Sequence, residues 1–468
     1  MWVVIKMKTI TQKKFEVDLL HGPILKAMLV FAVPLFFSGV FQQLYNTMDT
    51  VIIGHTLGDE ALAAMGAAGA VYDLLVGFAL GIGNGLAIVT ARSFGSGDTD
   101  FLRRSVAASV VIGVGITAVI TVAARLILYP FLEVLNTPAQ IIDGAYAYIA
   151  TITLFIGVMF AYNLCAGLLR AIGNSMMPLF FLILSSLLNI VLDLFFITQL
   201  AMGVQGAAVA TVIAQGVSVL ACLVYIGKKA DILIPKRKHF VRDQELYREM
   251  LAQGFSMAVM SSIVHAGSAI LQSGINSLGY LVIAGHAAAR KLFMFLMMPY
   301  MAISQTVSTF VAQNYGAGQM GRIRKAVKHS YLCGAVLTVF ITLFTMPLAP
   351  LMVRLLSGSS EAVVIENGAL YLQVVAPCLM ILALLNPSRF ALQSIGNKIL
   401  PIVSSVIELI GKYLFVAFLI PRFQYMAVIF CEPVIWFFMD LELLWAFWRN
   451  PQVCTGKLEE RESAGEKN

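Results

Sequence analysis

The chain has 468 residues, of which 59% are hydrophobic and only 12% are charged, with a formal net charge of +7. A soluble globular protein carries roughly 25% charged residues and has no interior large enough to hide this much apolar surface. Lipid removes the contradiction because apolar faces can then point outward, so the composition predicts a membrane protein.

Apolar runs recur along the whole chain from its N-terminus. A helix needs about 20 apolar residues to cross about 30 Å of hydrocarbon, and no strand-like alternation recurs at the spacing of an outer-membrane barrel. We therefore expect an all-α membrane protein with about twelve transmembrane helices. The runs lie near 26–50, 61–85, 104–128, 139–162, 176–199, 206–227, 251–275, 281–308, 328–352, 367–386, 399–420 and 425–447.

Lysine and arginine gather in every second loop, at 6–14, 92–104, 228–248, 322–328 and 449–461. By the positive-inside rule both termini are then cytoplasmic, as an even number of spans in the cell membrane requires. Basic residues spread along one membrane face argue against a nucleic-acid partner.

The domain boundaries follow from the same pattern. We expect an N-terminal lobe at 1–227, a cytoplasmic linker at 228–250 with an amphipathic helix around 242–250, a C-terminal lobe at 251–450 and a disordered tail at 451–468. The N-terminus lacks a cleavable signal architecture, and Met7 is an alternative start. Five of the six cysteines lie in apolar runs and none has a metal-ligand spacing.

Two passages show that the halves are copies. N-L-C-A-G-L-L-R-A-I-G-N-S-M-M-P at 163–178 matches N-P-S-R-F-A-L-Q-S-I-G-N-K-I-L-P at 386–401, and F-G-S-G at 94–97 matches Y-G-A-G at 315–318. Each half has six spans, so the repeats are parallel, and transporters built this way rock one half against the other. Transport is therefore the favoured function, ahead of a channel or a receptor.

Ionisable groups inside the bilayer are costly and are candidates for function. Asp49 lies near the outer end of the first span, with Gln42 and Tyr45 on the same helical face. Asn189 and Asp193 lie four residues apart on one face of the fifth span. Two carboxylates with amides, a phenol and hydroxyls nearby suit a proton or a sodium ion.

At this point the sequence resembles the multidrug and toxic compound extrusion (MATE) transporters over essentially its full length. The segments that carry the resemblance are Q-Q-L-Y-N-T-M-D-T-V-I-I-G-H-T-L-G at 42–58, R-A-I-G-N with its following proline, N-I-V-L-D at 189–193, and Y-G-A-G-Q-M-G-R-I-R at 315–324. The resemblance implies a V-shaped pair of six-helix lobes that exports organic, often cationic, compounds against inward flow of H⁺ or Na⁺.

The resemblance also implies roles for individual residues, by the polar cluster of the archaeal and DinF-like branches. Asp49 and Asp193 would carry the coupling ion, with Asn189 and Thr211 as neutral ligands, so that a bound Na⁺ would lie among these four. Gln42, Tyr45 and Asn163 would shape the substrate cavity. Pro34, which removes a backbone hydrogen bond from the first span, would provide a hinge.

Each of these residues has a plainer interpretation. Asp49 could be a helix-end residue wetted by the outer interface. Asn163 and Thr211 could be interhelical hydrogen-bond partners, Pro34 an inert kink, and Gln42 and Tyr45 ordinary interface residues.

Other polar groups have no assigned role. NorM-like members carry carboxylates in spans seven and ten, but these predicted spans hold none here, which puts coupling through the second lobe in doubt. Glu408 and Lys412 are four apart and are expected to neutralise each other. The roles of Asp73, Arg290 and Glu432 stay open.

The favoured hypothesis is a cation-coupled antiporter, expected to be a monomer that needs no cofactor, with amphiphilic organic cations and the lipid bilayer as its partners. The alternative is a flippase for a lipid-linked oligosaccharide, although flippases tend to have extra spans or a basic cavity. An enzyme is not supported, because the sequence holds no nucleophile elbow, H-E-x-x-H or Walker A motif.

Overall fold

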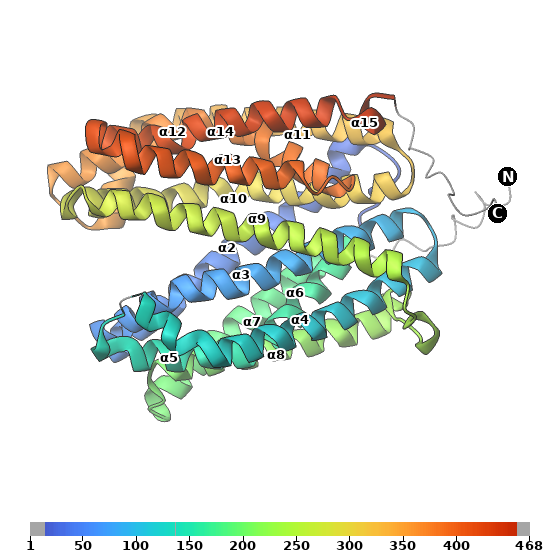
Figure 1. Cartoon of the computed structure of the whole chain (residues 1–468), viewed down its shortest axis with the longest axis horizontal. Helices are drawn as coiled ribbons and strands as arrows, with labels where there is room; N and C mark the ends of the chain where they lie inside the picture. The colour runs from blue at the N-terminus through green and yellow to red at the C-terminus, as the bar shows by residue number, and fades with distance from the viewer. Residues whose placement is uncertain (1–14, 136, 456–468) are drawn as a thin grey trace. The chain divides into compact units, whose positions relative to one another are not determined.

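The computed structural model describes residues 15–135 and 137–455. This part of the chain is helical and contains no strand (Figure 1), as the composition predicts. The first half forms α2 Ile24–Leu57, α3 Asp59–Gly95, α4 Thr99–Val134, α5 Ala139–Leu154, α6 Ile156–Ala171, α7 Met176–Leu194, η2 Phe195–Gln199 and α8 Gly203–Lys229. The second half forms α9 Gln244–Asn276, α10 Tyr280–Gly316, α11 Met320–Ser357, α12 Ala362–Ser394, α13 Leu400–Leu414, η5 Phe415–Leu419, α14 Ile420–Trp448 and α15 Pro451–Thr455.

The chain divides into two compact units. The first comprises Met1–Phe94 and Asp98–Ser262, and the second comprises Gly95–Gly97 and Ile263–Asn468. Helix α9 passes from one unit to the other at Ser262. We call the described parts of these units the first lobe and the second lobe.

The membrane-spanning helices account for the twelve predicted spans. Among the described residues, ten helices are long and apolar enough to cross a membrane, and the pair α5 and α6, bent by 51° at their junction, supplies one more. One of the ten is the continuous run Leu400–Trp448, whose 49 residues are more than twice the length that one crossing needs. Its backbone breaks at Gln424, where φ is 50° and ψ is −131°, so it makes two spans.

The exposed surface of these helices is apolar. Leu126 on α4 is 73% exposed and Leu343 on α11 is 71% exposed, values that would be costly in water but are ordinary in lipid. The core of the first lobe forms where α3, α4, α5, α6 and α8 meet, and it includes the fully buried Leu132, Ile149 and Ile152.

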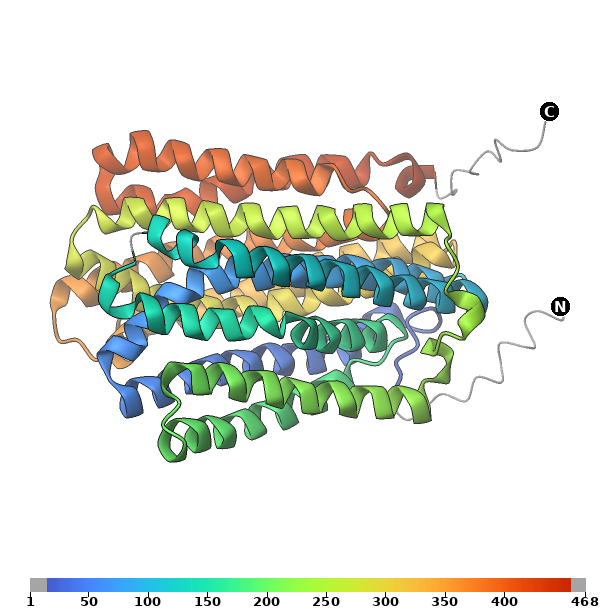
Figure 2. The same ribbon diagram turned by 60° about the horizontal axis from the view of Figure 1, so that its bottom comes forward.

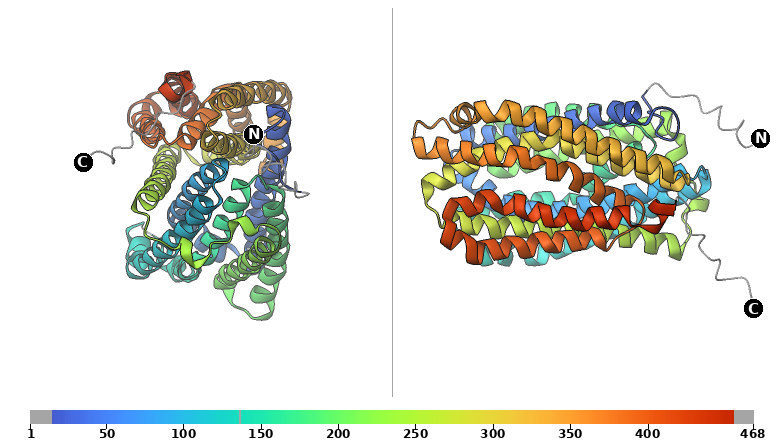
Figure 3. Two further views of the ribbon diagram at one scale, coloured as in Figure 1. Left: turned by 90° about the vertical axis from the view of Figure 1, so that its right-hand side faces the viewer. Right: turned by 90° about the horizontal axis from the view of Figure 1, so that it is seen from above.

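Three helices at one side of the first lobe position the site. Helix α7 packs along α8, and α2 packs against both; the green α7 and α8 lie beside the blue α2 in Figure 2. The end-on view in Figure 3 shows the same helices side by side.

The polar connection between α8 and α9 contains two short 3₁₀ turns, Asp231–Leu233 and Arg237–His239. Lys238 Nζ donates to Asp100 Oδ1 at 2.7 Å, which ties this connection to the start of α4. The polar segment expected to be an amphipathic helix is continuous with α9, which begins at Gln244. At the other end, 451–455 form α15, whereas the remainder of the expected tail, 456–468, lies outside the described residues.

Candidate functional site in the first lobe

Five polar side chains meet between α2, α7 and α8, and we call them the first-lobe polar cluster: Tyr45, Asp49, Asn189, Asp193 and Thr211. All five are buried; Asn189 and Asp193 are 0% exposed and Asp49 is 7% exposed. The structure thus brings together both predicted carboxylates and both predicted neutral ligands within one lobe. The burial of Asp49 differs from the wetted helix-end position considered above.

Helical spacing accounts for this convergence. Tyr45 and Asp49 are four residues apart on α2, and Asn189 and Asp193 are four apart on α7, so each pair lies on one face of its helix. Directly after Asp193 and Leu194 the α-helix widens into the π-helical turn η2. Such turns frequently occur at functional sites, because they change the direction of the neighbouring side chains.

A neutral amide links the two carboxyl groups. With its nitrogen facing the carboxylates, Asn189 Nδ2 donates to Asp49 Oδ1 at 2.8 Å and to Asp193 Oδ2 at 3.2 Å. Asp49 and Asp193 also lie close enough to interact directly with each other. Two neighbouring carboxylates repel each other unless a proton or a cation compensates their charge, so the geometry suits a bound proton or a cation that replaces it.

Hydroxyl groups complete the cluster on the α8 side. The Tyr45 hydroxyl donates to Thr211 Oγ1 at 2.9 Å, and the other end of the Asn189 amide lies 3.5 Å from the same oxygen. Carboxylate, amide and hydroxyl oxygens are hard donors of the kind that small hard cations prefer. Among the described residues, no group of three or more His, Cys, Asp or Glu side chains could hold a metal ion, so a sodium ion would depend on these mixed oxygens.

Three predicted residues lie outside the hydrogen bonds of the cluster. Gln42 is exposed, and its amide nitrogen lies 3.5 Å from Asn46 Oδ1 on its own helix. Asn163 Nδ2 donates to the Met159 carbonyl at 2.8 Å. Pro34 is buried, and its carbonyl accepts from Ser38 Oγ at 2.9 Å.

Two tyrosines near the cluster were missed in the sequence. Tyr72 on α3 and Tyr148 on α5 both interact electrostatically with Asp49, and Tyr148 also interacts with Asp193. A signal for one of them was available: Tyr148 and Tyr371 occupy the same position of the internal repeat, 223 residues apart.

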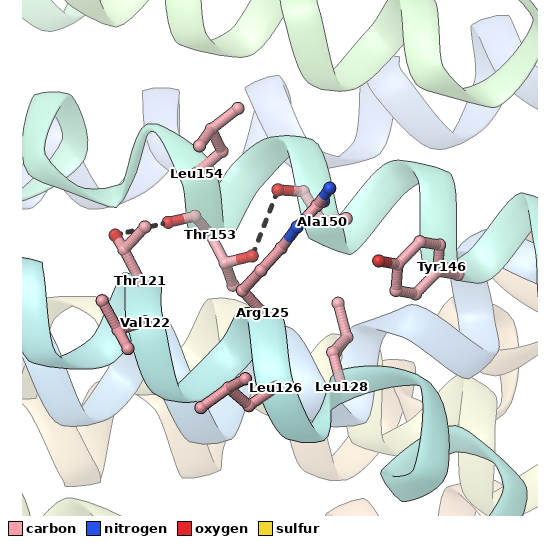
Figure 4. Close-up of a pocket in the computed structure, with 9 residues that line it drawn as sticks. All are labelled: Thr121, Val122, Arg125, Leu126, Leu128, Tyr146, Ala150, Thr153 and Leu154. Carbon is pink, nitrogen blue, oxygen red and sulfur yellow. Dashed lines mark hydrogen bonds between the residues drawn. The ribbon is translucent and has the colours of Figure 1, made fainter.

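A cavity of about 390 Å³ lies elsewhere in the first lobe, between α4 and α5 (Figure 4). Its walls include Val122, Leu126 and Leu154, which are 57% to 73% exposed. The close-up shows Arg125 and Tyr146 at this apolar crevice, with no member of the polar cluster among the lining residues. We therefore attribute it to packing at the lipid-facing surface.

The second lobe contains buried acidic side chains that are paired with basic ones. Glu408 and Lys412 form the expected pair within α13, with Lys412 Nζ 2.8 Å from Glu408 Oε1. The sequence did not reveal that Arg290 Nη1 lies 2.5 Å from Glu432 Oε2, which joins α10 to α14.

The fold and the cluster together define a multi-pass α-helical membrane protein with a duplicated six-helix architecture. The MatE family model matches residues 34–195 and again 256–419, so the family repeat coincides with the internal repeat read from the sequence. The chain belongs to the MATE family of transporters.

Relatives and solved structures agree with this assignment. The chain is 28% identical over 308 residues to the probable multidrug resistance protein YpnP of Bacillus subtilis, covering 65% of this chain and 68% of that protein. It is 26% identical over 349 residues to the probable multidrug resistance protein YoeA of the same organism, covering 72% and 74%. A crystal structure of MATE in complex with MaL6 matches the fold with a TM-score of 0.85 at 22% identity, covering 93% of this chain and 99% of that one.

Proposed function

We propose that the protein is a secondary antiporter that exports organic, cationic compounds in exchange for H⁺ or Na⁺ bound at the first-lobe polar cluster. The observation that carries this proposal is the buried pair Asp49 and Asp193, joined by the Asn189 amide. Buried carboxylates in a membrane lobe are costly unless they are paired or protonated. Neither carboxylate has an ion-pair partner among the described residues, so binding of a proton or a sodium ion would stabilise the pair.

Exchange follows from repulsion between two bound cations. A coupling ion held at Asp49 and Asp193 disfavours an organic cation beside the cluster, so the two are bound best in alternation. A ligand shifts a conformational equilibrium only by its differential affinity for the two states. The proposal requires the inward-open and outward-open states to differ in how these carboxylates are exposed.

The membrane and the orientation belong to the same proposal. The alternation of basic loops supports an orientation with both termini on the cytoplasmic side of the cell membrane. The names of the multidrug resistance relatives support small organic molecules as substrates.

Purified protein in liposomes provides the test, with a cationic dye and with pH and Na⁺ gradients imposed separately. One gradient, or both, should drive dye transport in the wild type, and Asp49→Asn and Asp193→Asn should each reduce it by at least ten-fold. Asp143→Asn is a matched control, because Asp143 is an exposed carboxylate on α5 outside the cluster. Dye that moves under neither gradient, with variants that behave like the wild type, would refute the proposal. Movement of a lipid-linked oligosaccharide instead would favour the flippase.

A further inference from the structure

The second lobe contains a buried network of alternating charges, the second-lobe charge cluster: Arg290, Tyr371, Glu408, Lys412 and Glu432. The Lys412 ammonium lies between two carboxylates, 2.8 Å from Glu408 Oε1 and 3.8 Å from Glu432 Oε1. The other oxygen of Glu432 lies 2.5 Å from Arg290 Nη1 and accepts from the Tyr371 hydroxyl at 3.3 Å. Helices α10, α12, α13 and α14 thus each contribute to one site.

The internal repeat places this cluster at the position of the first-lobe polar cluster. The 163–178 passage recurs 223 residues later, and with that offset Lys412 corresponds to Asn189 and Glu408 to Ser185. The burial pattern gives the offset for the last helix of each lobe: Thr211 and the buried residues around it on α8 are matched by buried residues on α14 221 positions later. Glu432 therefore corresponds to Thr211.

The matched positions of the two lobes differ in charge. In the first lobe, a neutral amide lies between two carboxylates that carry no cation of their own. In the second lobe, the residue at the amide's position is itself a cation, and its neighbours on α13 and α14 have become the carboxylates. The first lobe leaves negative charge for an ion to compensate, whereas the second compensates its own.

The lobe is also shaped around the lysine. Lys412 is 2% exposed, and its aliphatic chain passes directly over Gly267 on α9, where a Cβ atom would lie 3.1 Å from Lys412 Cδ. A buried ammonium without partners would cost several kcal/mol, so the two carboxylates and the space at Gly267 explain how the lobe holds it.

We propose that the second lobe carries a cation site that is occupied by the chain's own Lys412, in place of an exchangeable ion. The coupling ion then binds in the first lobe only, and the lysine determines that restriction. This inference deepens the proposed function and rests on it, because it takes the ion bound in the first lobe to be the one that drives export. Its site is the second-lobe charge cluster, and the ligand it excludes is a small monovalent cation.

Charge balance gives the consequence that can be tested. Arg290 and Lys412 balance Glu408 and Glu432, while the buried Arg389 on α12 donates to Ser405 and interacts electrostatically with Glu408 and Glu442. His286 on α10 lies close enough to interact with Glu432. Lys412→Met would remove one positive charge and leave the site with room and one uncompensated negative charge, so the variant should take up a sodium ion.

The experiment measures binding rather than transport, so it does not depend on the antiport proposal. The background is the full chain with Asp49→Asn and Asp193→Asn, which removes the carboxylates of the first lobe. In this background and at mildly alkaline pH, thermal stability is measured in NaCl and in choline chloride for the native second lobe and for Lys412→Met. Binding of ²²Na⁺ is measured on the same preparations.

Two matched controls accompany the variant. Lys412→Met with Glu408→Gln restores the charge balance and should gain no sodium binding. Lys291→Met removes an exposed lysine on α10 and should behave like the background.

We expect no selective sodium effect with the native second lobe, and a rise in Tm of about 5 °C in NaCl over choline chloride for Lys412→Met. If Lys412→Met is unstable in choline chloride, sodium should restore its folding. The proposal is overturned if Lys412→Met shows neither sodium binding nor sodium-dependent folding. It is equally overturned if the native second lobe binds ²²Na⁺ in a way that Glu432→Gln abolishes.

Discussion

Asp49 and Asp193 are stabilised differently from the acidic residues of the second lobe. Glu408 and Glu432 each have a cationic partner within 4 Å, whereas the first-lobe pair is joined by the Asn189 amide. An amide donates hydrogen bonds without adding charge, so it orders the two carboxylates. Their negative charge is still uncompensated until a proton or a cation binds. The different residues at these matched repeat positions account for the proposed asymmetry between the lobes.

The Tyr45 hydroxyl provides a prediction at this scale. Tyr45→Phe removes the 2.9 Å hydrogen bond to Thr211 and leaves a buried hydroxyl less well ordered. A neutral hydrogen bond contributes about 1 kcal/mol, so the apparent affinity for the coupling ion should fall by about five-fold. The ion-concentration dependence of dye transport in liposomes measures this. Tyr146→Phe at the lipid-facing crevice is the control, and an unchanged ion affinity in Tyr45→Phe would show that the bond does not order the site.

Among the helices, close approach depends on glycine at defined points. A Cβ atom on Gly85 of α3 would lie 2.6 Å from both the Gln253 carbonyl oxygen and Gly254 Cα of α9, within the first lobe. Small residues at such crossings allow two backbones to pack directly in a membrane, where van der Waals contact is a main source of helix association.

Gly85→Ala should therefore force α3 and α9 apart and destabilise the protein by about 1–3 kcal/mol. Gly115→Ala on α4 is the matched control, since nothing lies within 4 Å of its Cβ position, and removal of a helical glycine there should stabilise by about 0.5–1 kcal/mol. Thermal unfolding of the detergent-purified variants measures both effects. Equal Tm values for the two variants would contradict the packing described for α3 and α9.

The sequence predicted different features of these elements with different success. Twelve spans follow from the length of the apolar runs. The pairing of Glu408 with Lys412 follows from local spacing, because residues four apart on a helix share a face. The contact between Arg290 and Glu432 joins residues 142 positions apart, and no local pattern encodes it. The apolar runs are shorter than the helices where polar residues continue a helix beyond the hydrocarbon. The run expected at 367–386 lies within α12, which begins at Ala362 and includes the exposed Glu366.

At the scale of the whole molecule, the basic loops predict the orientation. Of the six cysteines, only Cys454 is exposed, and it lies on α15 near the C-terminus. A membrane-impermeant maleimide should therefore label it only after the membrane of intact cells is permeabilised. Cys454→Ser should abolish that labelling, and strong labelling of intact cells would place the C-terminus outside.

The central claim is that the first-lobe polar cluster couples ion movement to export. The most direct measurement compares, in the same Asp193→Asn liposomes, dye transport driven by an ion gradient with dye exchange down its own gradient. If the cluster binds the coupling ion, gradient-driven transport should be lost while downhill exchange stays within a few-fold of the wild type. A parallel loss of both activities, or the retention of both, would contradict the account.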